Sequence, residues 1–279
     1  TKVQFLPMYS QSRNFHNHNT HFNECMFFNP ETPQQICPRV WLGPHNALLN
    51  NTDNYGSNFL VQRNIKIIIN CGTTLPFLDL IENNRDVAIS SDVLILSLDP
   101  FFQSHDELAA NFTRKYSRIL ANYLNYFYKS NPNAAKLIHQ LPNSTDRIQI
   151  SSPILCGANL MMQFFSLIRL INLFKLINQE MEVLIISQDG NDNLLTGLMI
   201  AYLMDTYRYN LLNSFNMIKS RRPSIYDWSS VEYDALLKQF YTQNCEIKCT
   251  PLMDTIKRSS QEDDSELMAG GDRKRRFLH

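Results

Sequence analysis

The sequence has no surplus of charge of either sign, because its 26 lysines and arginines are balanced by 26 aspartates and glutamates. This balance excludes a protein whose overall charge draws it to nucleic acid or to an acidic membrane surface. No uninterrupted apolar run approaches the roughly 18 residues of a membrane span, and the first residues lack the apolar core of a signal peptide. We therefore expect a protein without a membrane span that works in the cytoplasm, the nucleus or both.

Closely spaced metal ligands are also scarce. The six cysteines are scattered along a long chain, which favours free thiols over a disulfide framework. Two groups come nearest to a metal site, namely His16, His18 and His21 with Cys25, and Cys245 with Cys249. The first is better explained as an Asn- and His-rich surface segment, and the second has no partner pair nearby. We expect no metal and no cofactor.

The composition, 44% hydrophobic and 19% charged over 279 residues, is sufficient for a sizeable core. We assign one α/β domain to residues 37–245, a polar arm to 1–36 and a polar tail to 246–279. Low hydrophobicity and blocks of like charge favour disorder in the tail. Its basic cluster, Arg273–Arg276, has two interpretations, a nuclear-import signal and an ordinary solvated terminus.

The segment from Val183 to Met204 organises the domain. Four apolar residues, Val183 to Ile186, are followed by a polar loop containing Gly190, and an apolar helical pattern begins near Leu194. This order predicts a buried strand, a loop and a helix. Because free backbone N–H groups of such a loop and of the helix start point into one concavity, α/β proteins hold anions there.

The same segment resembles the signature loop of the cysteine-dependent dual-specificity phosphatases. In that family a strand ending in His-Cys is followed by two residues, Gly, two residues, Arg, then Ser or Thr and a helix. On this pattern Ser187 falls on the nucleophilic Cys, Ile186 on the His, Gly190 on the Gly and Asn193 on the Arg. The helical pattern also starts one residue late, which predicts a loop of different shape.

These replacements remove the chemistry that the resemblance would imply. The family needs a thiolate nucleophile, which Ser187 cannot supply at neutral pH. It also needs a bidentate Arg clamp on phosphate, which Asn193 cannot reproduce. Two carboxylates, Asp189 and Asp192, would oppose a phosphate dianion through like charge. The candidate binding residues are Gln188, Asp189, Gly190, Asn191 and Asp192 of the loop, together with Arg221 and Arg222.

The resemblance extends in order along the domain: an opening strand in 37–47, a helix end and an Ile-Asn strand in 59–72, a strand in 93–99, an Arg-Arg-Pro helix in 211–225 and a final helix in 233–241. It implies that Asp99 has the place of the family's general acid. With no nucleophile present, a turn cap before Pro100 is the favoured interpretation of Asp99. Arg221 and Arg222 would support the loop and are candidates to neutralise Asp189 or Asp192.

An insertion at about 105–157 departs from the family. Helical spacing of aromatic and aliphatic residues predicts a long amphipathic helix over 106–129, and a second apolar helix follows over 158–179. The family normally has one helix here. Long inserted segments often carry function, so the insertion is our first candidate for a partner-binding surface, with decoration without a role as the alternative.

The resemblance implies a central, mostly parallel sheet flanked by helices. For function it implies a pseudophosphatase, a catalytically inactive member that binds or scaffolds another protein, such as a phosphoprotein or a kinase, and binds no nucleic acid. Two alternatives stay open. One is a divergent active phosphatase of phosphoproteins or phosphoinositides that uses Asp99 and another nucleophile such as Asp189. The other is a structural subunit of a larger assembly.

Overall fold

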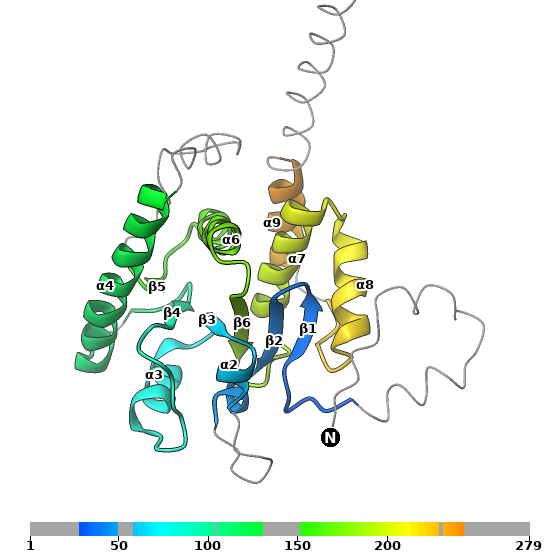
Figure 1. Ribbon diagram of the computed structural model, residues 1–279. Coiled ribbons are helices and arrows are strands. Elements are labelled where there is room, and N and C mark those ends of the chain that lie inside the picture. The colour runs from blue at the N-terminus through cyan, green and yellow to red at the C-terminus, as the bar shows by residue number, and fades with distance from the viewer. Residues whose placement is uncertain are drawn as a thin grey trace, which may run out of the picture.

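Six strands form one sheet in the computed structural model, which describes residues 28–49, 58–103, 105–130, 150, 152–228 and 231–242. The strands lie in the order β1-β2-β6-β3-β4-β5. Only β1 is antiparallel to its neighbour, and every other pair is parallel. Their bounds are β1 Gln34–Cys37, β2 Val40–Pro44, β3 Ile65–Cys71, β4 Leu94–Leu98, β5 Ile154–Leu155 and β6 Glu182–Ser187. The expected α/β class with a mostly parallel sheet is confirmed (Figure 1).

The strand β6 lies at the centre of this sheet, between β2 and β3. Its residues Val183 to Ile186 are completely buried. A parallel strand covered on both faces needs a continuous apolar run rather than an alternating one, and this run was the reason for predicting the strand. Because these strands are parallel, the carboxyl ends of β2, β3 and β4 lie at the same edge of the sheet as the carboxyl end of β6.

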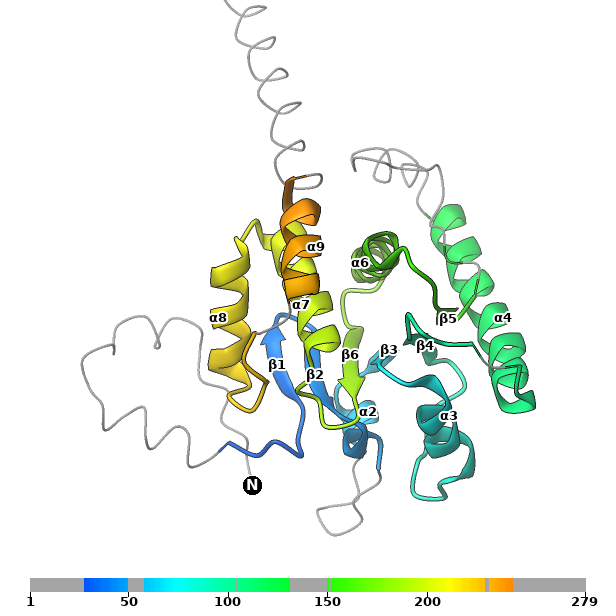
Figure 2. The same cartoon turned by 180° about the vertical axis from the view of Figure 1, so that it is seen from behind.

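Helices flank the sheet on both sides of β6. Figures 1 and 2 show α4 at the β4–β5 end and α8 beside β1 at the opposite end. The helices described are η1 His45–Leu48, α2 Phe59–Gln62, α3 Thr74–Asn83, α4 Glu107–Ser130, α6 Leu160–Ile177, α7 Asn193–Tyr207, α8 Leu211–Arg221 and α9 Val231–Tyr241. The helices expected over 106–129, 158–179, 211–225 and 233–241 are all present, with ends shifted by a few residues.

Three elements depart from the expectations. The helix α3 was not predicted, since its ten residues start at a Thr73 cap that makes no side-chain capping bond. The strand β5 lies inside the expected loop and exists through pairing with β4, where the Ser97 amide donates to the Pro153 carbonyl at 2.8 Å. The strand β1 begins at Gln34, inside the expected arm. Residues 1–27 and 243–279, with the candidate metal ligands and the basic cluster, lie outside the described residues.

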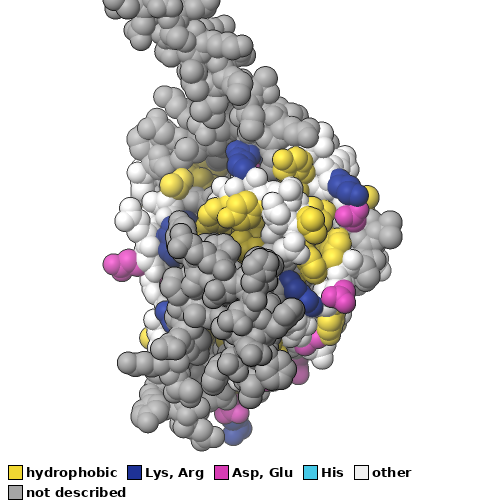
Figure 3. Space-filling model, turned by 90° about the vertical axis from the view of Figure 1, so that its right-hand side faces the viewer, with side chains coloured by type: hydrophobic (Ala, Val, Ile, Leu, Met, Phe, Trp, Pro, Cys, Tyr) yellow, Lys and Arg dark blue, Asp and Glu magenta, His cyan; other side chains and the backbone are white. Residues whose placement is uncertain are grey.

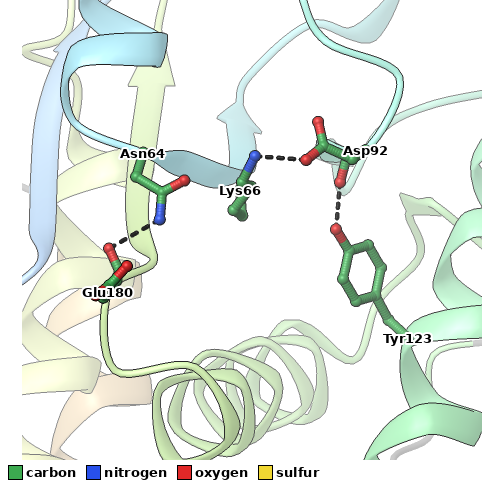
Figure 4. Close-up of polar contacts among 5 residues, drawn as sticks. All are labelled: Asn64, Lys66, Asp92, Tyr123 and Glu180. Atoms are coloured by element: carbon green, nitrogen blue, oxygen red, sulfur yellow. Dashed lines mark hydrogen bonds and ion pairs between the residues drawn. The ribbon is translucent and has the colours of Figure 1, made fainter.

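The inserted helix α4 packs through the predicted stripe, because Phe112, Tyr116, Leu120 and Phe127 are all buried. Polar contacts at the amino ends of the strands also hold it (Figure 4). The Tyr123 hydroxyl donates to the Asp92 carbonyl, and the Asp92 carboxylate pairs with Lys66 of β3 at 2.5 Å. Helix α4 is thus bonded to the segment that leads into β4.

One described helix, α6, is long and apolar enough to cross a membrane by length and composition alone. A little over half of it, 56%, is buried inside the protein. Leu167, Leu170 and Ile171 are completely or almost completely buried, and Arg169 on the same helix is only 5% exposed. The core helices of globular domains have the same composition, so this helix is weak support for a membrane span.

Candidate functional site

The loop of residues 188–192 joins the carboxyl end of β6 to the start of α7, as the sequence pattern predicted. Ser187 ends the strand and is 1% exposed. Asp192 is the residue that caps α7, and its carboxylate accepts a hydrogen bond from the Leu195 amide at 3.1 Å. A helix N-terminus attracts negative charge. In this chain the carboxylate of Asp192 already supplies it.

Side-chain oxygens of the loop accept hydrogen bonds from the loop's own backbone. The Gly190 amide donates to Ser187 Oγ at 3.0 Å, and the Asn191 amide donates to Asp189 Oδ1 at 2.9 Å. These N–H groups belong to the set that would face an anion in a loop of this type. Three amides at this turn, those of Gly190, Asn191 and Leu195, are therefore bound by side chains of the turn itself.

The two acidic side chains differ in their surroundings. Asp189 is partly exposed, and its second oxygen accepts a hydrogen bond from the hydroxyl of the exposed Tyr226. This bond and the charge of Asp189 raise the pKa of Tyr226. Burial raises the pKa of Asp192, and a hydrogen bond from Ser187 acts in the opposite direction. Burial therefore makes the charged form of the Asp192 side chain less stable than it would be in water.

Gly190 has a backbone that other residues adopt poorly, with φ of +73°. A Cβ atom at this position would lie 2.5 Å from the carbonyl carbon of Gly43 and 2.6 Å from Arg222 Nη2. The loop thus packs directly against β2, and only glycine fits there. Gly190, which the sequence pattern singled out, is therefore required by the close packing of the loop against β2.

Arg222 lies behind the loop and is completely buried. Its Nε donates to the Gly190 carbonyl at 2.7 Å, and its Nη2 donates to the Asp189 carbonyl at 2.9 Å. The same guanidinium binds the segment before β1, through the carbonyls of Pro30 and Thr32 and the side chain of Gln34. Burial lowers the pKa of Arg222 to about 10, partly offset by the charge of Asp189.

These contacts refine the expectation for the two arginines. Arg222 supports the loop as expected, through the carbonyls of Asp189 and Gly190 and the side-chain oxygen of Asn191. The Asp189 carboxylate is bonded instead to the Asn191 amide and the Tyr226 hydroxyl. Arg221, at the end of α8, is half-buried, and burial lowers its pKa. The charge of Arg222 is thus engaged with oxygen atoms behind the loop.

Asp99 is 8% exposed and bridges two segments. One carboxylate oxygen accepts from the Thr74 amide at 2.8 Å, at the start of α3, and the other accepts from the Phe101 amide at 3.3 Å. The favoured interpretation of Asp99 as a turn cap agrees with this geometry. Because both oxygens are bonded to backbone, the carboxylate holds α3 to the end of β4.

A chain of polar side chains crosses the carboxyl ends of the strands from η1 to Asp99. The Nε2 of His45 donates to Asn70 Oδ1 at 2.7 Å, and Asn70 Nδ2 donates to Ser97 Oγ at 3.0 Å. Ser97 Oγ in turn lies 2.9 Å from Thr74 Oγ1. Burial lowers the pKa of His45, while Asn70, Asp192 and Asp189 raise it. His45 was not predicted, since a lone histidine after a strand has no distinguishing pattern.

The uncharged residue in the place of the family's Arg, Asn193, is the first residue of α7. Its Oδ1 is buried and has no hydrogen-bond partner in the described part of the chain. Gln188 is exposed, and its carbonyl accepts from the His45 amide at 3.3 Å. Within the same part of the chain, no three residues of the types His, Cys, Asp and Glu gather in a way that could hold a metal.

A model of the YAL037W N-terminal domain family matches residues 31–190, which is more than half of the chain. The chain belongs to this family. The match begins beside the residues that bind Arg222, spans the six strands and the α4 insertion, and ends at Gly190 of the loop. Among curated proteins no match to the sequence is found.

The chain is also similar to solved structures of phosphatases and of a phosphatase-like protein. The human tyrosine phosphatase-like serine/threonine/tyrosine-interacting protein is 14% identical, with a TM-score of 0.41 over 76% of this chain and 97% of that one. A leucine-rich repeat and phosphatase domain protein from Entamoeba histolytica is 18% identical, with a TM-score of 0.34 over 76% and 92%. A phosphatase from Cydia pomonella is 16% identical, with a TM-score of 0.35 over 75% and 89%.

Proposed function

We propose that this protein is a pseudophosphatase, a catalytically inactive phosphatase-like protein that acts by binding another protein in phosphorylation signalling. The observation that carries the proposal is the closed state of the loop between β6 and α7. Asp192 caps the helix, and Ser187 and Asp189 bind the amides of Gly190 and Asn191. Three of the amides that could donate to a phosphate are thus engaged within the chain.

The side chains at the remaining positions support the same conclusion. Ser187 has a hydroxyl where a phosphatase of this type needs a thiolate. Asn193 is uncharged, and the buried Arg222 is bonded to main-chain carbonyls behind the loop. A phosphate group carries about −1.5 to −2 charge at neutral pH, and Asp189 and Asp192 would repel it. The loop therefore lacks the nucleophile, the clamp and the favourable field together.

Surfaces outside the loop are available for a protein partner. On the two helices at and after the insertion, Tyr126 of α4 and Leu176 of α6 are each 58% exposed. Hydrophobic side chains also lie between polar ones on the α8 side of the molecule (Figure 3), where Leu212 is 64% exposed. Exposed large side chains are the usual anchors of protein interfaces. We assign the partner first to the α4–α6 side. The phosphatases that this chain resembles normally have a single helix there, whereas this chain has two helices and an insertion.

Binding of tungstate, a phosphate analogue, tests the closed loop. Isothermal titration should detect no saturable binding to the wild-type protein. The double variant Asp189→Asn/Asp192→Asn removes both charges but keeps oxygen acceptors for the Asn191 and Leu195 amides, so any gain in binding reports charge alone. The variant Glu82→Gln/Asp86→Asn makes the same change in charge at exposed positions on the surface. Saturable binding to the wild-type protein would contradict the proposal.

Site-specific photo-crosslinking tests the partner surface. A photoreactive residue replaces Tyr126 in one variant and Val61, which is 73% exposed on α2, in the other. Both variants are expressed in the cells that naturally produce the protein. We expect the Tyr126 variant to form a discrete crosslinked band whose mass spectrum identifies one protein. The Val61 variant should form none. Crosslinks from Val61 alone would move the interface to the α2 side, and crosslinks from neither position would reject the α4–α6 assignment.

One contact favours the alternative of a divergent phosphatase. Ser187 donates a hydrogen bond to Asp192, a carboxylate whose pKa is raised by burial, and a base beside a hydroxyl is the arrangement of an activated nucleophile. Against this, Ser187 is 1% exposed and its oxygen also accepts the Gly190 amide. Turnover of an aryl phosphate that disappears in Ser187→Ala would establish the enzyme and reject the pseudophosphatase.

A further inference from the structure

The helix α4 presents a row of positive charge to the solvent. In Figures 1 and 2 the helix lies at the β4–β5 end of the molecule, with its outer side turned away from α6. Eight exposed residues lie opposite the buried aromatic stripe and form what we call the α4 face, namely Asn111, Arg114, Lys115, Arg118, Asn122, Asn125, Tyr126 and Lys129. Four of these residues are cations and none is acidic.

The cations of the α4 face are not neutralised by the part of the chain that the structure describes. Within that part, none of the four makes an ion pair with an acidic side chain. Arg114 donates to Asn111 Oδ1 at 3.4 Å, and Lys115 Nζ lies 5.0 Å from the centre of the Tyr116 ring. Both contacts are made inside α4 to uncharged groups. The charge of this face is therefore directed outward.

Three of the cations are also close enough to repel one another. Arg114 and Arg118 lie four residues apart, a spacing at which like charges destabilise a helix, and Lys115 lies on the same face between them. The neighbouring positions that could carry a compensating acid are uncharged, namely Ala110, Asn111, Ala121 and Asn122. Folding of the helix does not favour this arrangement, whereas an acidic ligand would stabilise it.

The dimensions of the α4 face indicate what kind of ligand fits. At about 1.5 Å of rise per residue, Arg114 and Arg118 are separated by about 6 Å along the axis, and Lys129 lies about 16 Å further on. An extended peptide, at about 3.3 Å per residue, covers this length with about seven residues. The three asparagines of the face can hydrogen-bond to the backbone of such a peptide.

Two other anionic partners fit the α4 face less well. A membrane surface is bound by helices that insert large apolar side chains, and the α4 face has no large aliphatic residue. Double-stranded DNA presents one charge per roughly 1.7 Å of its axis. The four cations are spread over about 22 Å of helix, so they would leave most of these charges without a partner.

We propose that the α4 face binds an acidic segment of a partner protein, with Arg114, Lys115 and Arg118 as the contacts for its carboxylates. Clusters of arginine recognise acidic motifs in this way. The inference rests on the proposed function, because it names the chemistry of the partner that we assign to the α4–α6 side. It also separates two surfaces by charge, since Asp189 and Asp192 repel anions from the loop and the α4 face attracts them.

Titration of the full chain with a synthetic peptide tests the preference of the α4 face. The peptide has about eight residues that alternate between Glu and Ser, and its neutral counterpart has Gln in place of Glu. Amide NMR signals of residues 111–129 report where each peptide binds. We expect these signals to shift with saturation for the acidic peptide, which should bind roughly tenfold more tightly than the neutral one. Binding should weaken as salt is added.

A triple variant and a matched control locate the charge that matters. Arg114→Gln/Lys115→Gln/Arg118→Gln should bind the acidic peptide about tenfold more weakly. Arg85→Gln/Arg208→Gln/Lys238→Gln removes the same charge at exposed positions outside α4 and should keep the affinity of the wild-type protein. Equal losses in both variants, or no saturation with the wild-type protein, would overturn the inference. Tighter binding of a DNA duplex or of phosphatidylserine vesicles would overturn the assignment to a protein segment.

Crosslinking from Tyr126 separates this inference from the proposed function. With a photoreactive residue at Tyr126, we expect the partner band to be lost in the triple variant and kept in its control. A band that persists in the triple variant would retain the partner and reject the acidic segment. No band in the chain with all its cations would reject the partner surface and this inference with it.

Discussion

The Nε atom of Arg222 donates a hydrogen bond to the carbonyl oxygen of Gly190 at 2.7 Å. The two residues are separated by 32 positions in the sequence, yet this bond fixes the middle of the loop to the end of α8. The same guanidinium also holds the segment before β1. A single side chain thus joins three parts of the domain.

Replacement of Arg222 by lysine should destabilise the fold. Lysine cannot reproduce the fork of donors that reaches six oxygens, so several buried carbonyls would lose their partners. We expect the free energy of unfolding to fall by about 3 kcal/mol, measured by urea denaturation. Arg85→Lys, at an exposed position, is the matched control and should leave the stability unchanged. Equal effects of both variants would show that the Arg222 network contributes nothing.

Replacement of Gly190 by alanine should disrupt the contact between the loop and β2. The new Cβ atom would lie 2.5 Å from the Gly43 carbonyl carbon, in addition to the strain of a positive φ. Gly157→Ala supplies the comparison, because Gly157 also has a positive φ but no atom within 4 Å of a new Cβ. We expect losses of about 3 kcal/mol and about 1 kcal/mol respectively. If thermal denaturation gives similar losses, the clash at Gly43 is relieved by movement.

The charge of Asp192 should make stability depend on pH. Burial raises the pKa of Asp192 in the folded protein above its unfolded value. In the pH window between these two values, the folded state retains a proton that the unfolded chain has lost. Stability therefore declines as pH rises through that window. Asp192→Asn cannot titrate, so its stability relative to the wild-type protein should increase from acid to neutral pH.

Two variants at Asp192, the cap of α7, separate the effect of its charge from the loss of its hydrogen bond. Asparagine keeps an oxygen for the Leu195 amide, whereas alanine does not. Asp192→Ala should be less stable than Asp192→Asn by about 1 kcal/mol at every pH. Chemical denaturation at several pH values from about 4 to about 8, a range that begins near the ordinary carboxyl pKa and extends above neutral pH, gives both results. A difference between the two variants that changes with pH would contradict this assignment.

The insertion should loosen when its bond to the sheet is removed. Tyr123→Phe deletes the donor to the Asp92 carbonyl and should lower stability by about 1 kcal/mol. Hydrogen exchange of the α4 amides should become faster, since this bond fastens α4 to the segment before β4. Tyr126→Phe makes the same chemical change on the same helix at a position that is 58% exposed. Both measurements should be unchanged in that variant.

Patterns of local sequence were enough to predict the strands and helices with strong periodicity. The apolar run at Val183–Ile186 and the aromatic stripe of α4 fall in this group. The strand β5 was missed because two residues carry no periodicity, and its conformation comes from pairing with β4. Helix α3 was missed because its start has a weak capping signal.

The candidate site was predictable in position and only partly in chemistry. The order of strand, glycine loop and helix located residues 187–193, and the identity of Ser187 and Asn193 predicted which groups would be lacking. The contacts that close the loop depend on distant residues, such as Tyr226 on Asp189 and Arg222 on Gly190. His45 and the polar chain to Asp99 come from four separate elements, and no local pattern in the sequence brings them together.

The attachment of the loop through Arg222 also orders events during synthesis. The ribosome makes β6 and the loop before it makes residue 222, because synthesis runs from the N-terminus and domains generally fold as units. The Pro30–Gln34 segment, made first, must wait for the same side chain. The loop and the Pro30–Gln34 segment can therefore be joined only after Arg222 at the end of α8 has left the exit tunnel, and until then their carbonyl groups lack this partner.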